Sequence, residues 1–454
     1  MNKKVITYGT FDLFHEGHER LLKRAKALGD YLIVGVTSDY FDKQRGKMNV
    51  EESLLERIEN IKKSGYADEI IVEEYNGQKI IDIQKHQIDI FTVGSDWINE
   101  FDYLKEYCEV VYLERTEDIS SSELRNMKHS IIHIGIVGTG RIAWRTALEL
   151  NYISGTYNNA VYNPKLESAT KFAQQYNIPL AFDNYNQFLD KVNAVYIASP
   201  HETHFEYAKK ALELGKHVLC EKPMVLSKKE AIELFDIAEK NNLVLMEAIK
   251  TAYAPGFLNL ISLVKQGKIG QVIDIEATFT KLISKKENQK EQSQREYNPK
   301  IGGSFTELAT YPLLPILKLF GKNYTSLDFK YLMQDNVDIY SKAYFQYENA
   351  FATAKVGIGA KSEGQLIVTG TKGYILAKSP WWLTKSFTVC YEDTNENEYF
   401  SAPFEGYGLR YELSDFVNQI RNIDSTTYKL SKEDSIFLAD IMEKFLQDRK
   451  KFEL

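Results

Sequence analysis

Two histidines, His15 and His18, stand three residues apart where a short apolar run gives way to a helical pattern. Side chains at positions i and i+3 of a helix share a face, so both imidazoles can reach a ligand at the helix N-terminus. That end of a helix has unpaired N–H groups and a partial positive charge, which favours a phosphate, and Gly17 lets the ligand approach the backbone. The spacing favours phosphate chemistry over a zinc site, which needs further ligands, and over a purely structural role.

A glycine-rich turn provides a second candidate for chemistry. Gly138, Gly140 and Ala143 have the G-x-G-x-x-G/A spacing, directly after an apolar run and before a helical pattern. This spacing in this context predicts a dinucleotide on the helix N-terminus, where Arg141 and Ile142 begin the helix.

The next strand of that unit indicates which dinucleotide is bound. It ends near Asn163 and Lys165, where no carboxylate is available to bind the ribose hydroxyls of NAD. Without a carboxylate there is no repulsion toward a 2'-phosphate, so NADP is slightly favoured over NAD.

Both candidates need the same kind of scaffold, an α/β sheet with nucleotide at its carboxyl edge. Short apolar runs alternate with helical patterns from residue 5 to about residue 127, and again from residue 131 to about residue 253. After residue 253 the runs are longer and lack intervening helices, as in 271–283, 342–359 and 364–377, which predicts a mostly antiparallel sheet. Residues 411–450 return to a helical pattern.

The composition fits a cytoplasmic globular protein better than a binder of nucleic acid or of membranes. The 454 residues carry a net charge of −7, so no general excess of cations exists to neutralise phosphates. The sequence has no long apolar segment of a signal peptide and no run of about 18 apolar residues. Three widely spaced cysteines, Cys108, Cys220 and Cys390, fit a reducing compartment.

Residues 3 to about 127 resemble the glycerol-3-phosphate cytidylyltransferases. The segments that carry the resemblance are "VITYGTFDLFHEGHERLLKRAKALGDYLIVGVTSD", "VGSDW" and "FDYLKEYCEVVYLERTEDIS". The resemblance implies CMP transfer from CTP to a phosphate with release of pyrophosphate, catalysed by positioning and charge stabilisation, with Mg²⁺ bound to the CTP.

The resemblance also implies roles for individual residues. His15, His18, Lys47 and Arg115 are the expected catalytic residues, with the histidines stabilising the α-phosphorus. The expected CTP-binding residues are Thr10, Phe11, Asp12, Gly17, Arg57, Asp96, Trp97, Thr116 and Ser120.

Two positions depart from the cytidylyltransferase pattern. Glu16 stands between the histidines where the family commonly has an aromatic residue, and Asp118 stands where the family has glycine. A carboxylate beside phosphates is repulsive, so the acceptor is expected to differ from glycerol 3-phosphate.

Residues 131–454 resemble the Gfo/Idh/MocA oxidoreductases. The resemblance runs through "AVYIASPHETHFEYAKKALELGKHVLCEKPM", "LMEAIKTAYAP" and "GGSFTELATYPLLPILKLFG". It implies that Lys222 of the EKP tripeptide acts on the carbonyl or alcohol oxygen, and that Tyr311, its pKa lowered by the lysine, is the proton donor. Glu307 stands at the other position where members of the family place an acid/base residue, and a packed core aromatic is the alternative for Tyr311.

The expected cofactor-binding residues combine the glycine-rich turn with segments of this resemblance. They are Gly138, Gly140, Arg141, Ile142, Asn163, Ser199, Pro200, His204, Glu221 and Pro223.

Together the two halves predict a bifunctional enzyme that makes a CDP-activated polyol for teichoic-acid-type or capsule polymers, acting on CTP, a polyol phosphate and a keto compound. The expected domains are a nucleotidyltransferase with a Rossmann-like fold (1–128), a dinucleotide-binding Rossmann domain (131–253) and an α+β domain (254–454) whose last helices pack back on the Rossmann domain. A homodimer is expected. The alternatives are a second half that binds a dinucleotide without turnover, and a first half that transfers AMP instead of CMP.

Overall fold

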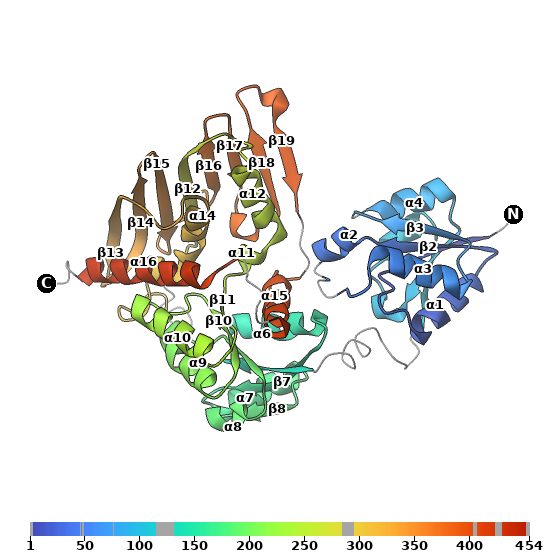
Figure 1. The fold of residues 1–454 in the computed structure, drawn as a ribbon, viewed down its shortest axis with the longest axis horizontal. Helices are drawn as coiled ribbons and strands as arrows, with labels where there is room; N and C mark the ends of the chain where they lie inside the picture. Colours follow the sequence, from blue (N-terminus) through green and yellow to red (C-terminus); the bar gives the residue numbers. More distant parts are fainter. Residues whose placement is uncertain are drawn as a thin grey trace. The chain divides into compact units, whose positions relative to one another are not determined.

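The structure is a computed structural model of the 454-residue chain. It describes residues 3–45, 47, 50–75, 77–114, 131–283, 295–402, 406–422 and 429–450. The chain divides into two compact units, Met1–Ile131 with Tyr152–Thr156, and Ile132–Asn151 with Tyr157–Leu454, and each is described by itself (Figure 1).

The first unit is built on a five-stranded parallel sheet with the strand order β3-β2-β1-β4-β5. The strands are β1 Lys4–Gly9, β2 Tyr31–Thr37, β3 Glu69–Glu73, β4 Ile90–Gly94 and β5 Glu109–Leu113. The strand order reverses between β1 and β4. Ligands of open α/β sheets bind beside such a reversal, at the carboxyl ends of the strands.

Helices cover both faces of this sheet. They are α1 Glu16–Lys26, α2 Asp39–Gln44, α3 Leu54–Ser64 and α4 Gln78–His86, with short 3₁₀ turns η1 Ser95–Trp97 and η2 Asp102–Glu106. Apolar residues of α1 and α3 pack on one face of the sheet, and those of α4 pack on the other. Helix α1 begins at Glu16, directly after His15.

The second unit contains two sheets, the first of which has six strands in the order β11-β10-β9-β6-β7-β8. The neighbouring strands β11 and β10, β10 and β9, and β9 and β6 pair in parallel, as do β7 and β8. The strands are β6 Ile132–Val137, β7 Thr156–Tyr162, β8 Leu180–Phe182, β9 Ala194–Ile197, β10 His217–Glu221 and β11 Leu245–Ala248. The helices along this sheet are α6 Arg141–Glu149, η3 Leu150–Tyr152, α7 Leu166–Gln175, α8 Tyr185–Leu189, η4 His201–Thr203, α9 His204–Glu213, α10 Lys228–Lys240 and α11 Lys250–Tyr253.

The other sheet of this unit has eight strands in the order β13-β14-β15-β12-β16-β17-β18-β19, all antiparallel except the pair β12 and β15. The strands are β12 Val272–Thr280, β13 Ser326–Gln334, β14 Val337–Tyr347, β15 Ala350–Gly357, β16 Leu366–Gly370, β17 Tyr374–Ala377, β18 Ser386–Cys390 and β19 Glu398–Ser401. The accompanying helices are α12 Pro255–Lys265, α13 Ser304–Leu308, α14 Thr310–Phe320, η5 Trp381–Leu383, η6 Thr394–Glu396, α15 Arg410–Arg421 and α16 Lys432–Lys450.

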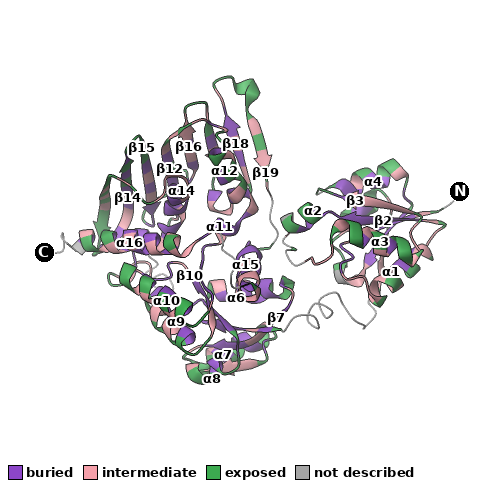
Figure 2. Ribbon diagram, viewed as in Figure 1, coloured by how far each residue is buried: buried purple, intermediate pink, exposed green. Residues whose placement is uncertain are grey.

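Burial follows this layered arrangement. Figure 2 shows buried residues along the strands and exposed residues on the outer sides of the helices. The core of the six-stranded sheet includes Ala439 of α16, and Lys228 N donates to Glu443 Oε2 of the same helix (3.0 Å), so α16 contacts α10. The α/β architecture with two parallel sheets and one mostly antiparallel sheet confirms the predicted fold class. Among the described helices, none has the length and apolar character needed to cross a membrane.

Candidate active sites

The turn that follows β1 has an unusual backbone. Phe11 and Leu13 have positive φ angles of 55° and 48°, which non-glycine residues rarely adopt. The buried ring of Phe11 contacts the imidazole of His18 at 5.3 Å between centroids. Such a backbone persists only where its surroundings enforce it, and here the packing of Phe11 fixes the turn beside the histidines.

His15 and His18 lie together at the start of α1. His15 is the N-cap, and its Nδ1 accepts a hydrogen bond from Gly17 N at 3.1 Å. A neutral His15 therefore carries its proton on Nε2. The two imidazole rings stack with their centroids 3.9 Å apart. The structure thus brings the histidines together at a helix N-terminus, with His15 acting as the cap instead of lying inside the helix.

Lys47 reaches the same turn from the loop that follows α2. Its Nζ donates to Thr10 Oγ1 (2.9 Å), and that hydroxyl donates to Asp42 Oδ1 (3.1 Å). Asp12 is buried and accepts from the backbone N–H groups of Glu51 and Glu52 (3.0 and 2.9 Å). Thr10 and Lys47 are therefore in contact, while Asp12 holds the loop in place.

Arg57 has a different environment from the one expected of a residue that contacts the triphosphate. Its side chain is fully buried, and Nη1 donates to Thr10 O (2.7 Å) and Thr37 O (3.0 Å). Its guanidinium also pairs with Asp39 (2.5 Å) and Asp42 (3.4 Å). This is a correction: the protein itself uses these donors, so Arg57 stabilises the turn that carries Thr10.

The structure describes only some of the other residues predicted for this site. Trp97 is exposed over 45% of its surface, and its ring lies 5.9 Å from that of Phe101. Asp96 belongs to η1, but its side chain is outside the description. Arg115, Thr116, Asp118 and Ser120 lie outside the described residues. Glu16 pairs with Arg20 one turn along α1, which compensates the extra carboxylate.

Sequence reasoning missed a buried lysine in the first unit. Lys79, in the first turn of α4, pairs with Glu73 at the end of β3, and its Nζ lies 4.6 Å from the ring centre of Tyr8. Burial lowers the pKa of Lys79, against the opposing effect of Glu73. In the sequence, Lys79 shares a helix face with Asp82 and Ile83. This spacing is typical of an ordinary amphipathic helix, so it did not indicate that the lysine is buried.

In the second unit the glycine-rich turn connects β6 to α6. Gly138 has φ +101°, and a Cβ there would lie 2.8 Å from the carbonyl oxygen of Ala198, so only glycine fits. Gly140 is the N-cap of α6, and Arg141 and Ile142 begin the helix. The N–H groups at this helix start, next to a turn that contains two glycines, fit a pyrophosphate.

Asn163 follows β7 and contacts this turn. Its Nδ2 donates to Thr139 Oγ1 (2.9 Å), and its Oδ1 accepts from Lys165 N (2.9 Å). The structure therefore brings the residues predicted to bind the cofactor ribose beside the glycine-rich turn.

His204 is buried, although we expected it along the nicotinamide. Its ring nitrogens lie 2.9 Å from the carbonyl oxygens of Pro223 and Ser199. Burial lowers the pKa of His204 to about 4, and a neutral ring donates only one hydrogen bond. This corrects the prediction: His204 links the Ser199–Pro200 segment to Lys222–Pro223 from inside the protein.

Lys222 follows β10 and is held by three neighbours. Its Nζ donates to the carbonyl oxygen of Glu307 (3.0 Å) and lies 5.3 Å from the ring centre of Tyr311. Its backbone N–H donates to Glu221 (3.2 Å), whose carboxyl accepts from Tyr196 (2.5 Å). Burial raises the pKa of Glu221. The predicted pair Lys222 and Tyr311 is therefore assembled, with Glu221 supporting the lysine.

The pKa of Tyr311 changes in the direction opposite to our expectation. Burial raises it above its usual value of 10, as do the nearby carboxyl groups of Glu221 and Glu412, while Arg141 and Arg145 oppose the change. The predicted lowering by Lys222 is wrong because desolvation of the phenolate is the larger effect. Tyr311 keeps its proton at neutral pH, as a proton donor requires.

Glu307 faces a histidine that the sequence did not single out. Its Oε1 lies 3.7 Å from His201 Nδ1, which accepts from Arg295 Nη2 (2.8 Å). Burial, then Arg295, lower the pKa of His201 to about 3, so this histidine is neutral and forms no ion pair with Glu307. Arg295 and His201 are 94 positions apart, and no local spacing could indicate their contact.

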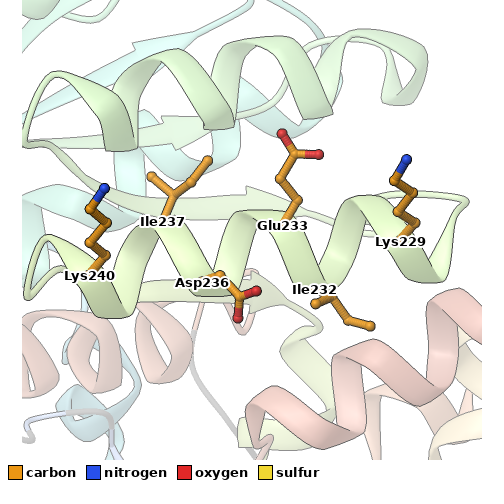
Figure 3. Close-up of a pocket in the computed structure, with 6 residues that line it drawn as sticks. All are labelled: Lys229, Ile232, Glu233, Asp236, Ile237 and Lys240. Carbon is orange, nitrogen blue, oxygen red and sulfur yellow. The ribbon is translucent and has the colours of Figure 1, made fainter.

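One surface hollow lies apart from these groups. It is lined by Lys229, Ile232, Glu233, Asp236, Ile237 and Lys240, all on α10 (Figure 3). Because it contains none of the predicted site residues, we assign it no ligand.

Three family descriptions match the chain. They are "Cytidylyltransferase-like" for residues 6–156, "Oxidoreductase family, NAD-binding Rossmann fold" for 132–249, and "GFO/IDH/MocA C-terminal domain" for 257–376. Over 123 residues the chain is 54% identical to glycerol-3-phosphate cytidylyltransferase of Bacillus spizizenii, which covers 27% of this chain and 95% of that protein. The chain is a fusion of these two families. It is therefore both a nucleotidyltransferase and an NAD(P)-dependent oxidoreductase.

The oxidoreductase part has relatives of its own. It is 28% identical over 317 residues to scyllo-inositol 2-dehydrogenase (NADP(+)) IolU of Bacillus subtilis, covering 69% of this chain and 95% of that protein. A structure of levoglucosan dehydrogenase with NADH and levoglucosan has the same fold, with a TM-score of 0.63, 18% identity, and coverage of 71% of this chain and 98% of that one. The glycine-rich turn and Asn163 accordingly belong to an NAD(P)-binding domain.

Proposed function

We propose that the chain makes a CDP-activated polyol by two reactions. The cytidylyltransferase part transfers CMP from CTP to a polyol phosphate related to glycerol 3-phosphate, and the oxidoreductase part reduces a keto compound of the same pathway. The observation that carries this proposal is the fusion itself, in which one chain assembles a histidine pair at a helix N-terminus and a lysine beside a protonated tyrosine.

In CMP transfer, His15 and His18 stabilise the charge that develops on the α-phosphate, because their rings lie at the start of α1. Lys47 neutralises phosphate charge from its place beside Thr10. Arg115 is a further predicted catalytic residue, and Thr116 and Ser120 are predicted to bind CTP. Mg²⁺ bound to CTP would withdraw charge from the phosphates.

In carbonyl reduction, bound NAD(P)H would supply the hydride for the carbonyl carbon, and the carbonyl oxygen would take up a proton. Lys222 polarises that oxygen, and Tyr311 donates the proton, since its pKa is raised and its ring lies next to the ammonium. Ser199, Pro200, Glu221 and Pro223 are proposed to border the cofactor.

We propose NADP as the physiological cofactor. Asn163 and Lys165 offer an amide and an ammonium where NAD-specific domains usually offer a carboxylate. The Bacillus subtilis relative is a scyllo-inositol 2-dehydrogenase (NADP(+)), which supports this choice.

The pathway, the location in the cell, the oligomeric state and the domain boundaries are predictions. We propose that the product feeds teichoic-acid-type or capsule polymers, that the chain acts in the cytoplasm as a homodimer, and that its domains are 1–128, 131–253 and 254–454.

Two variants of the full chain test the proposal. We expect CTP-dependent release of pyrophosphate and NADPH oxidation from one polypeptide, with His18→Ala abolishing only the first and Lys222→Ala only the second. Mass spectrometry after adding CTP, NADPH and a panel of keto-phosphates would identify the product. Comparison of the four nucleoside triphosphates would reveal an adenylyltransferase. NADPH binding without reduction of any panel member would contradict the reductase proposal.

A further inference from the structure

Two lysines near Lys222 have no role in the reactions described so far. Lys250 begins α11, directly after the segment that follows β11, and its Nζ lies 3.5 Å from the carbonyl oxygen of Tyr407. Lys281 follows β12. Both side chains are partly buried. Within the described ranges, neither ammonium has a carboxylate within ion-pair distance.

Ring contacts and one hydrogen bond link the reaction centre to the two segments that carry these lysines. Tyr311, beside Lys222, contacts Phe279 at 5.1 Å between centroids, and Phe279 stacks on Trp382 at 3.7 Å. The carbonyl oxygen of Trp382 accepts from Thr251 Oγ1 (2.6 Å), and Thr251 is the neighbour of Lys250.

Lys281 approaches from the strand that carries Phe279. Its backbone N–H donates to Gly357 O (2.8 Å), and Ile283 N donates to Ile358 O (2.9 Å), so the extended pairing continues past β12. Residues two apart on an extended backbone share a face. The side chain of Lys281 therefore lies on the same side of the sheet as Phe279, toward Tyr311.

Other cationic side chains lie near both lysines. Burial lowers the pKa of both, and Lys222 acts in the same direction on each, with Arg145 affecting Lys250 and Arg141 affecting Lys281. The carboxyl groups that face Lys250 are Glu412 and Glu221, and burial raises the pKa of both.

Glu412 is a carboxyl group near Lys250 that does not neutralise the charge of its ammonium group. It is fully buried, and no hydrogen bond reaches either of its oxygens. A carboxyl group in that condition favours its neutral form. Glu296 and Glu307 face Lys281, without forming an ion pair with it. Partly buried ammonium groups that form no ion pair favour an anionic ligand.

We propose that Lys250 and Lys281 bind the phosphate monoester of the carbonyl substrate. This inference rests on the proposed reductase function. A phosphate dianion accepts charge-assisted hydrogen bonds from both ammonium groups, and it anchors the substrate so that its carbonyl faces Lys222 and Tyr311.

The proposal also orders the two reactions. The hydride of NADPH forms the new C–H bond, the carbonyl π pair moves to oxygen, and the proton of Tyr311 completes the alcohol, leaving NADP⁺. The product is an alcohol with a free phosphate monoester, which is the acceptor that CMP transfer requires. Reduction therefore precedes activation, because CMP would cover the phosphate that the lysines bind.

The test compares phosphorylated and free forms of the same carbonyl compounds. Dihydroxyacetone, erythrulose and ribulose would be offered with and without their terminal phosphates to the full-length wild type, Lys250→Met, Lys281→Met and the double variant. We expect kcat/KM for the phosphorylated form to fall about tenfold or more for each lysine, since each charge-assisted hydrogen bond contributes that much. Activity on the free form should be unchanged. Lys330→Met, on an exposed position of β13, is the matched control.

Further measurements separate this proposal from its rivals. An equal loss for both forms, or weaker NADPH binding in fluorescence titration, would overturn the phosphate assignment. If the wild type reduces no compound, the proposed reductase function fails. Calorimetry with inorganic phosphate and the NADP⁺-loaded protein then still decides the inference. The double variant should lose a component of phosphate binding that Lys330→Met keeps, and equal binding would refute the proposal.

Discussion

The pKa values and hydrogen-bond partners of individual residues in this chain depend on tertiary contacts that their sequence neighbours do not predict. Tyr311 lies beside an ammonium group, yet burial and two carboxyl groups raise its pKa. Arg57 lies at the carboxyl ends of β1 and β2, where we expected it to bind CTP, yet the protein itself uses its hydrogen-bond donors. In both residues desolvation and tertiary contacts outweigh the property that the residue type alone would predict.

The raised pKa of Tyr311 leads to a prediction about pH. We expect the rate of carbonyl reduction to stay level from pH 7 to about 10, because the phenol keeps its proton over that range and would lose it only above its usual value. Tyr311→Phe should lower kcat about a hundredfold or more and leave NADPH binding unchanged. Stopped-flow NADPH oxidation against pH measures both effects, with Tyr331→Phe on β13 as the control. A fall in rate below pH 9 that Tyr311→Phe abolishes would contradict this role.

Local spacing predicted the residues that one turn brings together. His15 with His18, and Gly138 with Gly140, lie within four positions of each other, so the helix or turn that contains them determines their geometry. The missed contacts join distant segments, such as His201 with Arg295, or the cluster around Glu412 and Lys250. Only the packing of whole elements brings those residues together.

Among the elements, α13 determines where Lys222 lies, because the carbonyl oxygen of Glu307 on α13 accepts from the lysine. The start of α13 is fixed by Asp338 of β14, whose Oδ2 accepts from Phe305 N and Ser304 Oγ, both at 2.8 Å. Arg449 of α16 pairs with the same carboxylate (3.0 Å), and the arginine and the aspartate are both buried. The C-terminal helix α16 thus secures the helix that positions Lys222.

Asp338→Asn tests this arrangement. The change leaves the Arg449 guanidinium buried without its counter-charge, which should cost about 3 kcal/mol of stability. We also expect kcat for reduction to fall between about tenfold and a hundredfold as Lys222 loses its position. Urea unfolding and NADPH oxidation measure these effects, and release of pyrophosphate should stay unchanged. Asp190→Asn, at the exposed end of α8, is the control. Wild-type kcat in a destabilised Asp338→Asn would refute the positioning role.

At the scale of the whole molecule, the eight-stranded sheet offers a surface for the expected homodimer. Helices α13 and α14 pack on the face that contains buried alanines of β14 and β15, such as Ala343 and Ala354. Strand alternation places Tyr344 and Phe351 on the opposite face, where Phe351 is 60% exposed. The same face carries Lys342 and Lys355 in one row, and it carries Asp328, Asp274 and Glu276 in adjacent rows.

We expect a second copy of the chain to be the partner of this surface. In a two-fold arrangement the lysine row of one copy meets the acidic row of the other, around a centre of exposed aromatic residues. Phe351→Asp should therefore convert the dimer to a monomer in light scattering, because it places a carboxylate in the apolar centre. Leu214→Asp, at a half-exposed site on the edge of α9, should leave the dimer intact. A wild-type monomer at micromolar concentration, or an intact dimer in Phe351→Asp, would show that this face is not the interface.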